Sequence, residues 1–204
     1  MCISPRLGVS AVDYGIFRYY QILNNSKDMD NFKSLVFIGD SLTQWGDWER
    51  RLPGYQVTNL GISGETVEGL LARRERIRAQ IYNPDFIFLM TGINNIASEL
   101  YDIIPPYREI VRNLTTWYKQ ATVVVQSLLP VDSNWVSDAV IQDTNRQLKE
   151  IACEFNTEYL DVYKLFVDAK GISRNGYLSD DGVHLAEKGY DAWAREVERF
   201  ILKK

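Results

Sequence analysis

The sequence predicts an α/β fold in which a five-stranded parallel sheet carries helices on both faces. Three observations lead to this prediction: five short strand-like runs occur in order, stretches with helical spacing separate them, and three of the runs are almost entirely apolar. Strands that alternate with helices are typical of parallel sheets, because the helix returns the chain to the start of the next strand. Strands covered on both faces lose the alternation of polar and apolar residues.

The strand-like runs are short and are bounded by turn-forming or polar residues. In chain order they are Leu35–Ile38, Gln56–Leu60, Phe86–Met90, Thr122–Leu129 and Glu158–Val162. The first, third and fourth contain the stretches LVFI, FIFLM and TVVV. Continuous apolar runs of this length indicate strands that are buried on both faces.

Helices are predicted wherever apolar residues recur three and four positions apart, because such residues share one face of a helix. Four stretches have this spacing: Val67–Ile81, Ile103–Trp117, Val140–Phe155 and Tyr190–Ile201. The last of them closes the chain, so the predicted order ends on a helix that packs against the sheet.

A single domain is expected to span residues 1–204, because 204 residues suffice for one sizeable core and no linker-like or repeated segment divides them. Residues 1–30 precede the first strand. Their aromatic and aliphatic side chains suggest an extension that packs on the body of the domain.

Composition and charge exclude several classes of protein. The net charge of -4 gives no support for nucleic-acid binding, and the basic run Arg73-Arg74-Glu75-Arg76 is interpreted as a solvated helix face. No apolar stretch is long enough to span a bilayer, so stable membrane insertion is not expected.

Cytoplasmic residence is expected from the cysteines and from the start of the chain. Cys2 and Cys153 are isolated and form no CxxC pair, which fits a reducing compartment better than a disulfide scaffold. The first residues contain tyrosines, an Asp and an Arg where a signal peptide would have an uninterrupted apolar run.

Small and polar residues follow three of the predicted strands, where ligands collect in sheets of this kind. These segments are Gly39–Thr43, Gly61–Gly64 and Thr91–Asn95. The carboxyl ends of parallel strands meet at one edge of the sheet, so we expect any chemistry to be found there.

His184, the only histidine, lies three residues after Asp181 in a glycine-containing loop. Such a turn can bring the Asp181 carboxylate to the ring Nδ1 and leave Nε2 free to accept a proton. Ser41 follows the first buried strand and is a candidate nucleophile for this base. The alternative is that Ser41 only caps a helix. Asp180 is a second candidate for the orienting carboxylate.

Gly61 and Asn94 are candidate donors to a developing negative charge. Gly61 lacks a side chain, so its backbone N–H can approach a substrate closely, and Asn94 brings an amide to the end of the third strand. Donors of this kind stabilise an oxyanion. The alternatives are a turn at Gly61 and a loop-stabilising hydrogen bond at Asn94.

Taken together, these segments resemble the GDSL esterases and lipases, also called SGNH hydrolases. The matching blocks are Gly39-Asp40-Ser41-Leu42, Asn59-Leu60-Gly61, Gly92-Ile93-Asn94-Asn95 and Asp181-Gly182-Val183-His184, which occur in the family's order. The overall shape is most similar to small bacterial lysophospholipase or thioesterase-like members and to those that resemble platelet-activating-factor acetylhydrolase.

The resemblance implies a three-layer α/β/α sandwich of the flavodoxin-like SGNH type and a role for each matching residue. Ser41 is implied as nucleophile, His184 as base and Asp181 as orienting acid. The backbone N–H groups of Ser41 and Gly61 and the Asn94 side chain are implied as oxyanion donors. Asn95 departs from the pattern, because the family usually has Asp at this position, generally in a structural role.

No metal or other cofactor is expected. One histidine and two scattered cysteines do not make a zinc site. A magnesium site from Asp40 and Asp181 is the rival interpretation, and it leaves Ser41, Asn94 and His184 without a role. A nucleotide site is not indicated, because the sequence contains neither GxGxxG nor GxxxxGK[ST]. A binding module with an inactive site is the non-enzymatic alternative.

The expected substrate is a small ester, with a preference for short acyl groups. Trp45, Trp48 and Tyr55 could line an acyl or sugar pocket or could equally form the apolar face of the first helix. The one longer loop, Pro130 to Asp138, carries a single large apolar residue, Trp135. Lysophospholipids, acyl thioesters and acetylated carbohydrates remain alternatives. Nothing in the sequence indicates the oligomeric state.

Overall fold

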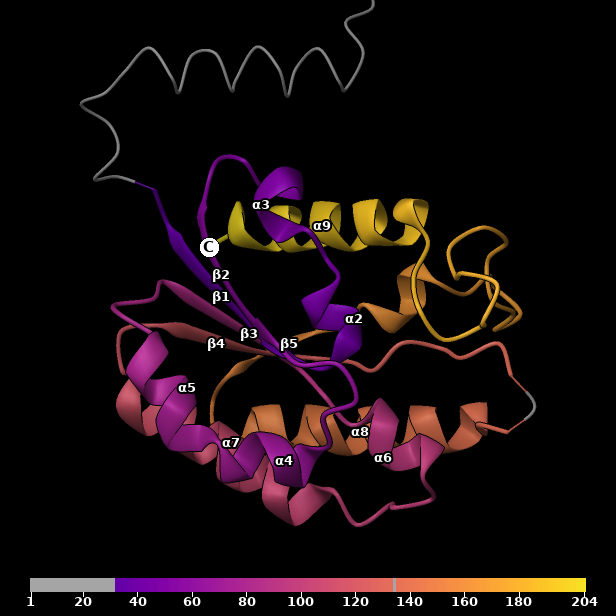
Figure 1. The fold of residues 1–204 in the computed structure, drawn as a ribbon, viewed down its shortest axis with the longest axis horizontal. Coiled ribbons are helices and arrows are strands. Elements are labelled where there is room, and N and C mark those ends of the chain that lie inside the picture. Colours follow the sequence, from indigo (N-terminus) through magenta and orange to yellow (C-terminus); the bar gives the residue numbers. More distant parts are fainter. Residues whose placement is uncertain (1–31, 134) are drawn as a thin grey trace, which may run out of the picture.

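The computed structural model describes residues 32–133 and 135–204, which form a five-stranded, all-parallel sheet between two layers of helices (Figure 1). The strand order is β2-β1-β3-β4-β5, the order of flavodoxin-like doubly wound sheets. The strands are β1 (Ser34–Gly39), β2 (Gln56–Gly61), β3 (Phe86–Met90), β4 (Thr122–Gln126) and β5 (Glu158–Leu160). The predicted fold class is confirmed.

Two strands are shorter than the sequence predicts, since β5 ends at Leu160 rather than at Val162 and β4 is shortened as well. β4 ends at Gln126 rather than at Leu129, because the side chain of Asn145 binds the next residues. Asn145 Oδ1 accepts the Leu128 N–H at 2.6 Å and its Nδ2 donates to the Leu128 carbonyl at 3.0 Å. Leu128 and Leu129 nevertheless remain buried. The apolar run therefore marks a buried loop as well as a strand.

Helices cover the two faces unequally (Figure 1). On one face lie α3 (Trp48–Arg51) and α9 (Glu187–Ile201). On the other lie α4 (Val67–Ala72), α5 (Arg74–Gln80), α6 (Ile93–Ala97), α7 (Ile104–Trp117) and α8 (Asp138–Glu154). Two short elements, α2 (Ser41–Gln44) and the 3-10 helix η2 (Tyr163–Leu165), follow β1 and β5.

The helix predicted over Val67–Ile81 is divided into α4 and α5 at Arg73. Arg73 turns its guanidinium back toward β2, where Nη2 donates to the Leu60 carbonyl at 2.7 Å and to Glu65 Oε2 at 2.6 Å. Only part of the basic run is therefore a solvated face. Arg74, Glu75 and Arg76 are exposed, whereas the Arg73 side chain is mostly buried in an ion pair with Glu65.

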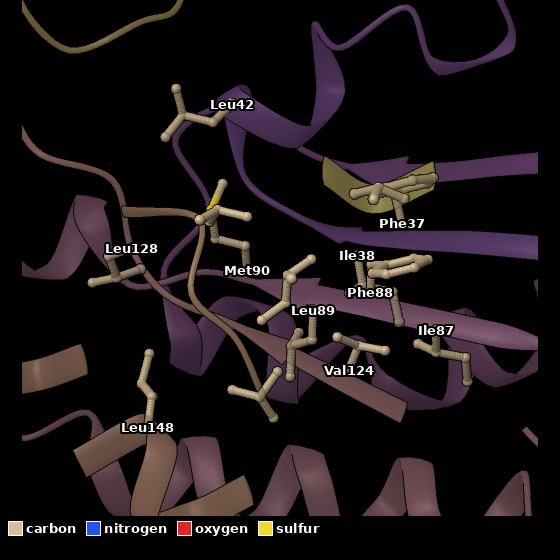
Figure 2. Close-up of a cluster of buried hydrophobic side chains, with 14 of the residues drawn as sticks. Phe37, Ile38, Leu42, Ile87, Phe88, Leu89, Met90, Val124, Leu128 and Leu148 are labelled. Carbon is tan, nitrogen blue, oxygen red and sulfur yellow. The ribbon is translucent and has the colours of Figure 1, made fainter. Parts of the chain in front are cut away.

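The core fixes the position of β1 and of the residues that follow it. Figure 2 shows Phe37 of β1 and Phe88 of β3 among the buried side chains of the sheet. The Trp48 ring of α3 stacks on Phe37 with centroids 4.2 Å apart and meets Trp193 of α9 edge-on at 4.7 Å. Aromatic contacts of this size dominate core packing, so the carboxyl end of β1 is held from both the sheet and the helix layer.

Residues 1–30, which the sequence predicts to pack on the domain, lie outside the described residues. Within the described ranges, no helix has the length and apolar character needed to cross a membrane.

Candidate active site

Ser41 is the first residue of α2 and follows a tight turn at the end of β1. Asp40, not Ser41, caps this helix: its Oδ1 accepts the Leu42 N–H at 3.0 Å. The turn requires Gly39, because a Cβ there would lie 2.1 Å from the Met90 carbonyl oxygen. The capping alternative for Ser41 is therefore wrong, and its hydroxyl is left for another partner.

That partner is His184, from the loop that precedes α9. Its Nε2 lies 3.0 Å from Ser41 Oγ, and its Nδ1 lies 2.6 Å from Asp181 Oδ2. A proton on Nδ1 is donated to the carboxylate, so Nε2 is the nitrogen that accepts from the serine hydroxyl. Residues 143 positions apart in sequence are thus joined at the carboxyl edge of the sheet.

Asp181 is held as a carboxylate by its own loop. Its Oδ1 accepts the N–H groups of Val183 and His184, both at 2.9 Å, and the Ser179 hydroxyl at 2.8 Å. Burial alone would raise the pKa of Asp181, but these bonds and the one from the His184 ring outweigh it and hold the pKa below its usual range. Asp180 is exposed and makes no hydrogen bond to the ring in the described part of the chain.

The loop that carries His184 is anchored to the segment after β4. The Asp132 N–H donates to the Gly182 carbonyl at 2.8 Å. Gly182 has a φ of +71°, and a Cβ there would lie 2.2 Å from the Asp132 carbonyl oxygen. Only glycine fits both conditions without strain, which explains the glycine between Asp181 and His184.

Two candidate oxyanion donors have hydrogens available. The Ser41 N–H, at the start of α2, has no hydrogen-bond partner among residues 32–133 and 135–204. Asn94 Nδ2 donates one hydrogen to the Glu65 carbonyl at 2.9 Å, and its second amide hydrogen has no partner within the same ranges. The bond to Glu65 fixes the amide plane, so the loop-stabilising role predicted as an alternative is also present.

The N–H of Gly61, the third candidate donor, already has a partner, because it donates to Asn59 Oδ1 at 3.0 Å. A Cβ at Gly61 would lie 2.4 Å from the Gln44 nitrogen, so close packing of β2 against α2 already requires glycine here. Three residues later, Gly64 has a φ of +75° and an N–H without a partner in the part of the chain that the structure describes. The sequence predicts Gly64 only as part of the polar segment Gly61–Gly64, because an unpaired N–H leaves no mark in a sequence.

The sequence profile of the GDSL-like Lipase/Acylhydrolase family matches residues 37–192. The chain belongs to this family. It is therefore a hydrolase, and the match includes Ser41, Asp181 and His184.

Several known proteins are similar to this GDSL-like acylhydrolase. Platelet-activating factor acetylhydrolase IB subunit alpha1 of Rattus norvegicus is 25% identical over 193 residues, which cover 91% of this chain and 81% of the relative. A GDSL-like lipase of Bacteroides thetaiotaomicron shares the fold, with a TM-score of 0.67, 23% identity and coverage of 93% and 98%. An acetyl xylan esterase of Geobacillus stearothermophilus has a TM-score of 0.66, 25% identity and coverage of 83% and 94%.

Asn95, where this acylhydrolase departs from the usual family pattern, is fully buried, and in the described part of the chain none of its side-chain hydrogen bonds involves Ser41 or His184. Its side chain hydrogen-bonds to α4. The substitution therefore affects how Asn94 is supported rather than the serine and histidine themselves.

Asp40 is a buried carboxyl group beside the candidate nucleophile. Its Oδ2 has no hydrogen-bond partner in the described ranges. Burial raises the pKa of Asp40 to about 7, with a smaller contribution from the nearby Glu65 charge, against the lowering effect of the Leu42 N–H.

Within the described ranges, no group of three or more His, Cys, Asp or Glu residues is arranged to hold a metal ion.

The three aromatic residues after Ser41 have different environments. Trp48 lies in the core and Tyr55 is partly buried against it. Trp45 is 52% exposed and stacks on the His184 ring, with centroids 4.1 Å apart. The sequence predicts pocket and core as equal alternatives for all three residues, and the structure places Trp48 and Tyr55 with the core and Trp45 beside His184.

Proposed function

We propose that this acylhydrolase is a serine esterase that cleaves carboxylic esters of short acyl groups through a Ser41–His184–Asp181 triad and an acyl-enzyme intermediate. The observation that carries the proposal is the chain of two contacts from Ser41 Oγ to His184 Nε2 at 3.0 Å and from His184 Nδ1 to Asp181 Oδ2 at 2.6 Å. This arrangement matches the geometry in which a histidine activates a serine hydroxyl.

In the first half of the reaction, Ser41 Oγ attacks the ester carbonyl carbon while its proton passes to His184 Nε2. The carbonyl oxygen becomes negative. We assign its stabilisation to the Ser41 N–H, the Gly61 N–H and the Asn94 amide. The Gly61 N–H would have to leave or share its bond to Asn59, and the free N–H of Gly64, in the loop that follows β2, is the alternative donor.

In the second half, the tetrahedral intermediate collapses and the C–O bond to the alcohol breaks. His184 Nε2 gives its proton to the departing alcohol oxygen, which leaves the acyl group on Ser41. A water molecule then donates its proton to the same nitrogen and attacks the acyl carbon. The acid is released and Ser41 regains its hydrogen. The ionised Asp181 stabilises the imidazolium in both halves.

The names of two relatives support a short acyl group, because one is an acetylhydrolase and the other an acetyl xylan esterase. The second also supports acetylated carbohydrate as an alternative substrate class. Lysophospholipids and acyl thioesters are the remaining alternatives. Family membership argues against the binding module with an inactive site. Cytoplasmic residence belongs to the same proposal and rests on the isolated cysteines.

Covalent labelling tests the proposal directly. An alkyl p-nitrophenyl phosphonate should inactivate the protein and add its mass to the peptide that contains Ser41. Ser41→Ala should take up no label, whereas Ser173→Ala, a control serine outside the site, should be labelled like the wild type. Label on a different residue would contradict the assignment of the nucleophile. Activity that survives exhaustive EDTA treatment would in addition reject the magnesium alternative.

A further inference from the structure

One arginine side chain closes the loop between β2 and α4, residues 62–66. Arg73 Nη2 donates to the Leu60 carbonyl at 2.7 Å, near the end of β2, and to Glu65 Oε2 at 2.6 Å, near the start of α4. Arg73 Nε donates to the other carboxylate oxygen, Glu65 Oε1. A single guanidinium therefore holds the two ends of this loop together.

The ion pair between Arg73 and Glu65 is largely shielded from water. The two side chains are 13% and 7% exposed, whereas those of the Arg146–Asp143 pair on α8 are 60% and 55% exposed. Exposed pairs contribute little, because water and salt screen them. Two parallel N–H···O bonds between a guanidinium and a carboxylate fix direction as well as distance. The Arg73–Glu65 pair is therefore able to restrain the backbone to which it is joined.

The Leu60 carbonyl and the Gly61 N–H belong to the same peptide group. That group is planar, so a hydrogen bond that fixes the carbonyl also fixes the direction of the N–H. Arg73 binds the carbonyl, and the Gly61 N–H projects from the opposite side of the group. A charged donor at the carbonyl also polarises the amide and makes its N–H a stronger donor. Arg73 thus acts on one proposed oxyanion donor through a single peptide group.

Glu65 connects the same guanidinium to a second proposed donor. Its side chain binds Arg73, and its backbone carbonyl accepts Asn94 Nδ2 at 2.9 Å. That bond fixes the plane of the Asn94 amide, whose other hydrogen is the one assigned to the oxyanion. The position of the Glu65 backbone therefore determines where this second hydrogen points.

The end of α4 does not require the Arg73 side chain. The backbone N–H of Arg73 donates to the Gly69 carbonyl at 3.2 Å and closes the last turn. Arg74, the next residue, has an exposed side chain that donates to the Leu71 carbonyl at 3.3 Å, within its own turn. An arginine at this bend can thus stay on the surface, so the inward direction of Arg73 has a different explanation.

We propose that Arg73 is a positioning residue for the oxyanion donors. It holds the Gly61 N–H through the Leu60 carbonyl and the Asn94 amide through Glu65, and it does not contact the substrate itself. The inference rests on the proposed function, because Gly61 and Asn94 are donors only if an oxyanion forms at Ser41.

The test separates the effect on catalysis from the effect on stability. Kinetics with p-nitrophenyl acetate and thermal unfolding are measured for the wild type, Arg73→Met and Glu65→Met/Arg73→Met. Both variants should lower kcat by about tenfold and change KM less than about twofold, because slightly misplaced donors lose stabilisation of the transition state. The double variant should recover melting temperature, since apolar residues that replace a buried ion pair often preserve stability. Recovery of kcat together with the melting temperature would overturn the positioning role.

Two control variants accompany the test. Arg74→Met removes a neighbouring but exposed guanidinium and should leave kcat unchanged. Ile77→Ala removes a buried side chain from α5 and should lower the melting temperature without lowering the kcat of the folded protein. An equal fall in kcat for Ile77→Ala and Arg73→Met would show that Arg73 is only structural.

Asn94→Ala distinguishes failure of this inference from failure of the proposed function. Arg73 and Asn94 act on the same charge, so their effects on kcat should be less than multiplicative in the double variant; fully multiplicative effects would overturn the inference. If Asn94→Ala lowers kcat and Arg73→Met does not, the positioning role is wrong and the proposed function stands. If neither variant lowers kcat, the oxyanion assignment is wrong, and the positioning role fails with it.

Discussion

The Asn95 side chain donates to Glu68 Oε2 at 2.7 Å and accepts the Val67 N–H at 2.9 Å, which ties the end of β3 to the first turn of α4. The family motif that the sequence resembles has Asp at the position of Asn95. An aspartate could accept the same N–H but would place a second negative charge against Glu68. Asn95 and Glu68 are therefore complementary. Burial alone would raise the pKa of Glu68, but the hydrogen bond from the Asn95 amide, together with those from the Glu68 backbone and Thr66, lowers it below its usual value. Their pairing supports the neighbouring Asn94.

Asn95→Asp should lower both the free energy of unfolding and kcat, and Glu68→Gln should restore both in the double variant. The expected loss is about 1–3 kcal/mol, the usual effect of disrupting a buried hydrogen-bonded group. Thermal unfolding and ester turnover of the four proteins in the double-mutant cycle measure the coupling. Additive effects, with no recovery in the double variant, would show that Asn95 and Glu68 act independently.

Ser41→Ala and His184→Ala should each reduce kcat by several orders of magnitude. Members of a triad act as a unit, so the loss of either removes nearly all nucleophilic catalysis. Turnover of p-nitrophenyl acetate measures the effect, and circular dichroism checks the fold. A Ser41→Ala protein that kept a tenth of the wild-type kcat would return Ser41 to a structural role.

Asn94→Ala should reduce kcat by about 10²–10³ while KM changes little, because an oxyanion donor acts on charge that appears only in the transition state. Asn113→Ala, a substitution of an amide in α7 away from the site, serves as a comparison. Weaker substrate binding at normal kcat would contradict the role of Asn94. It would leave only the bond to the Glu65 carbonyl as its function.

The wild type should lose stability as the pH rises, and the Asp40→Asn variant should not show this loss. Asp40 has a pKa of about 7 in the native state, whereas an unfolded aspartate titrates near pH ~3.9. Between these values the unfolded chain releases a proton that the native state keeps. Stability linked to Asp40 is therefore complete below about pH 4, declines as the pH rises and is lost above about pH 7.

Melting temperatures from pH 4 to pH 8 test this expectation. The wild type should lose stability relative to Asp40→Asn across that range, since asparagine can still accept the Leu42 N–H. Asp180→Asn, which changes an exposed carboxylate, should follow the wild type. Parallel curves for wild type and Asp40→Asn would show that Asp40 keeps the same protonation state in both folded and unfolded protein.

Most of the fold could be predicted from the sequence, because buried parallel strands and amphipathic helices have clear periodicities. The predictions are wrong where a side chain forms a hydrogen bond to the backbone of a distant segment. Such a bond ends a strand or a helix before its apolar pattern ends. Asn145 ends β4 before the apolar run ends, and Arg73 turns back from a helix pattern to the Leu60 carbonyl. Both bonds join segments that are distant in the sequence, so local spacing does not reveal them.

The residues of the candidate site could also be predicted from the sequence, because their types and positions are recognisable. Their side-chain contacts could not. Ser41, Asp181 and His184 could be proposed from the sequence because a triad needs particular residue types at the ends of strands and in glycine turns. The bond from Gly61 to Asn59 and the stacking of Trp45 on His184 depend on side-chain direction. Sequence spacing does not determine that direction, so Trp45 and Trp48 could not be told apart before the structure.

The preference for short acyl groups is open to a direct test with p-nitrophenyl acetate, butyrate, octanoate and palmitate under matched detergent. Each CH₂ of an acyl chain contributes about 0.8 kcal/mol only if protein covers it. The loop after β2 carries Ile62 as its apolar side chain, next to the exposed Ser63 and Gly64, and offers little to cover a long chain. We expect kcat/KM to be highest at acetate or butyrate and to fall by octanoate. A maximum at octanoate or beyond would contradict the short-acyl preference and favour a lysophospholipid substrate.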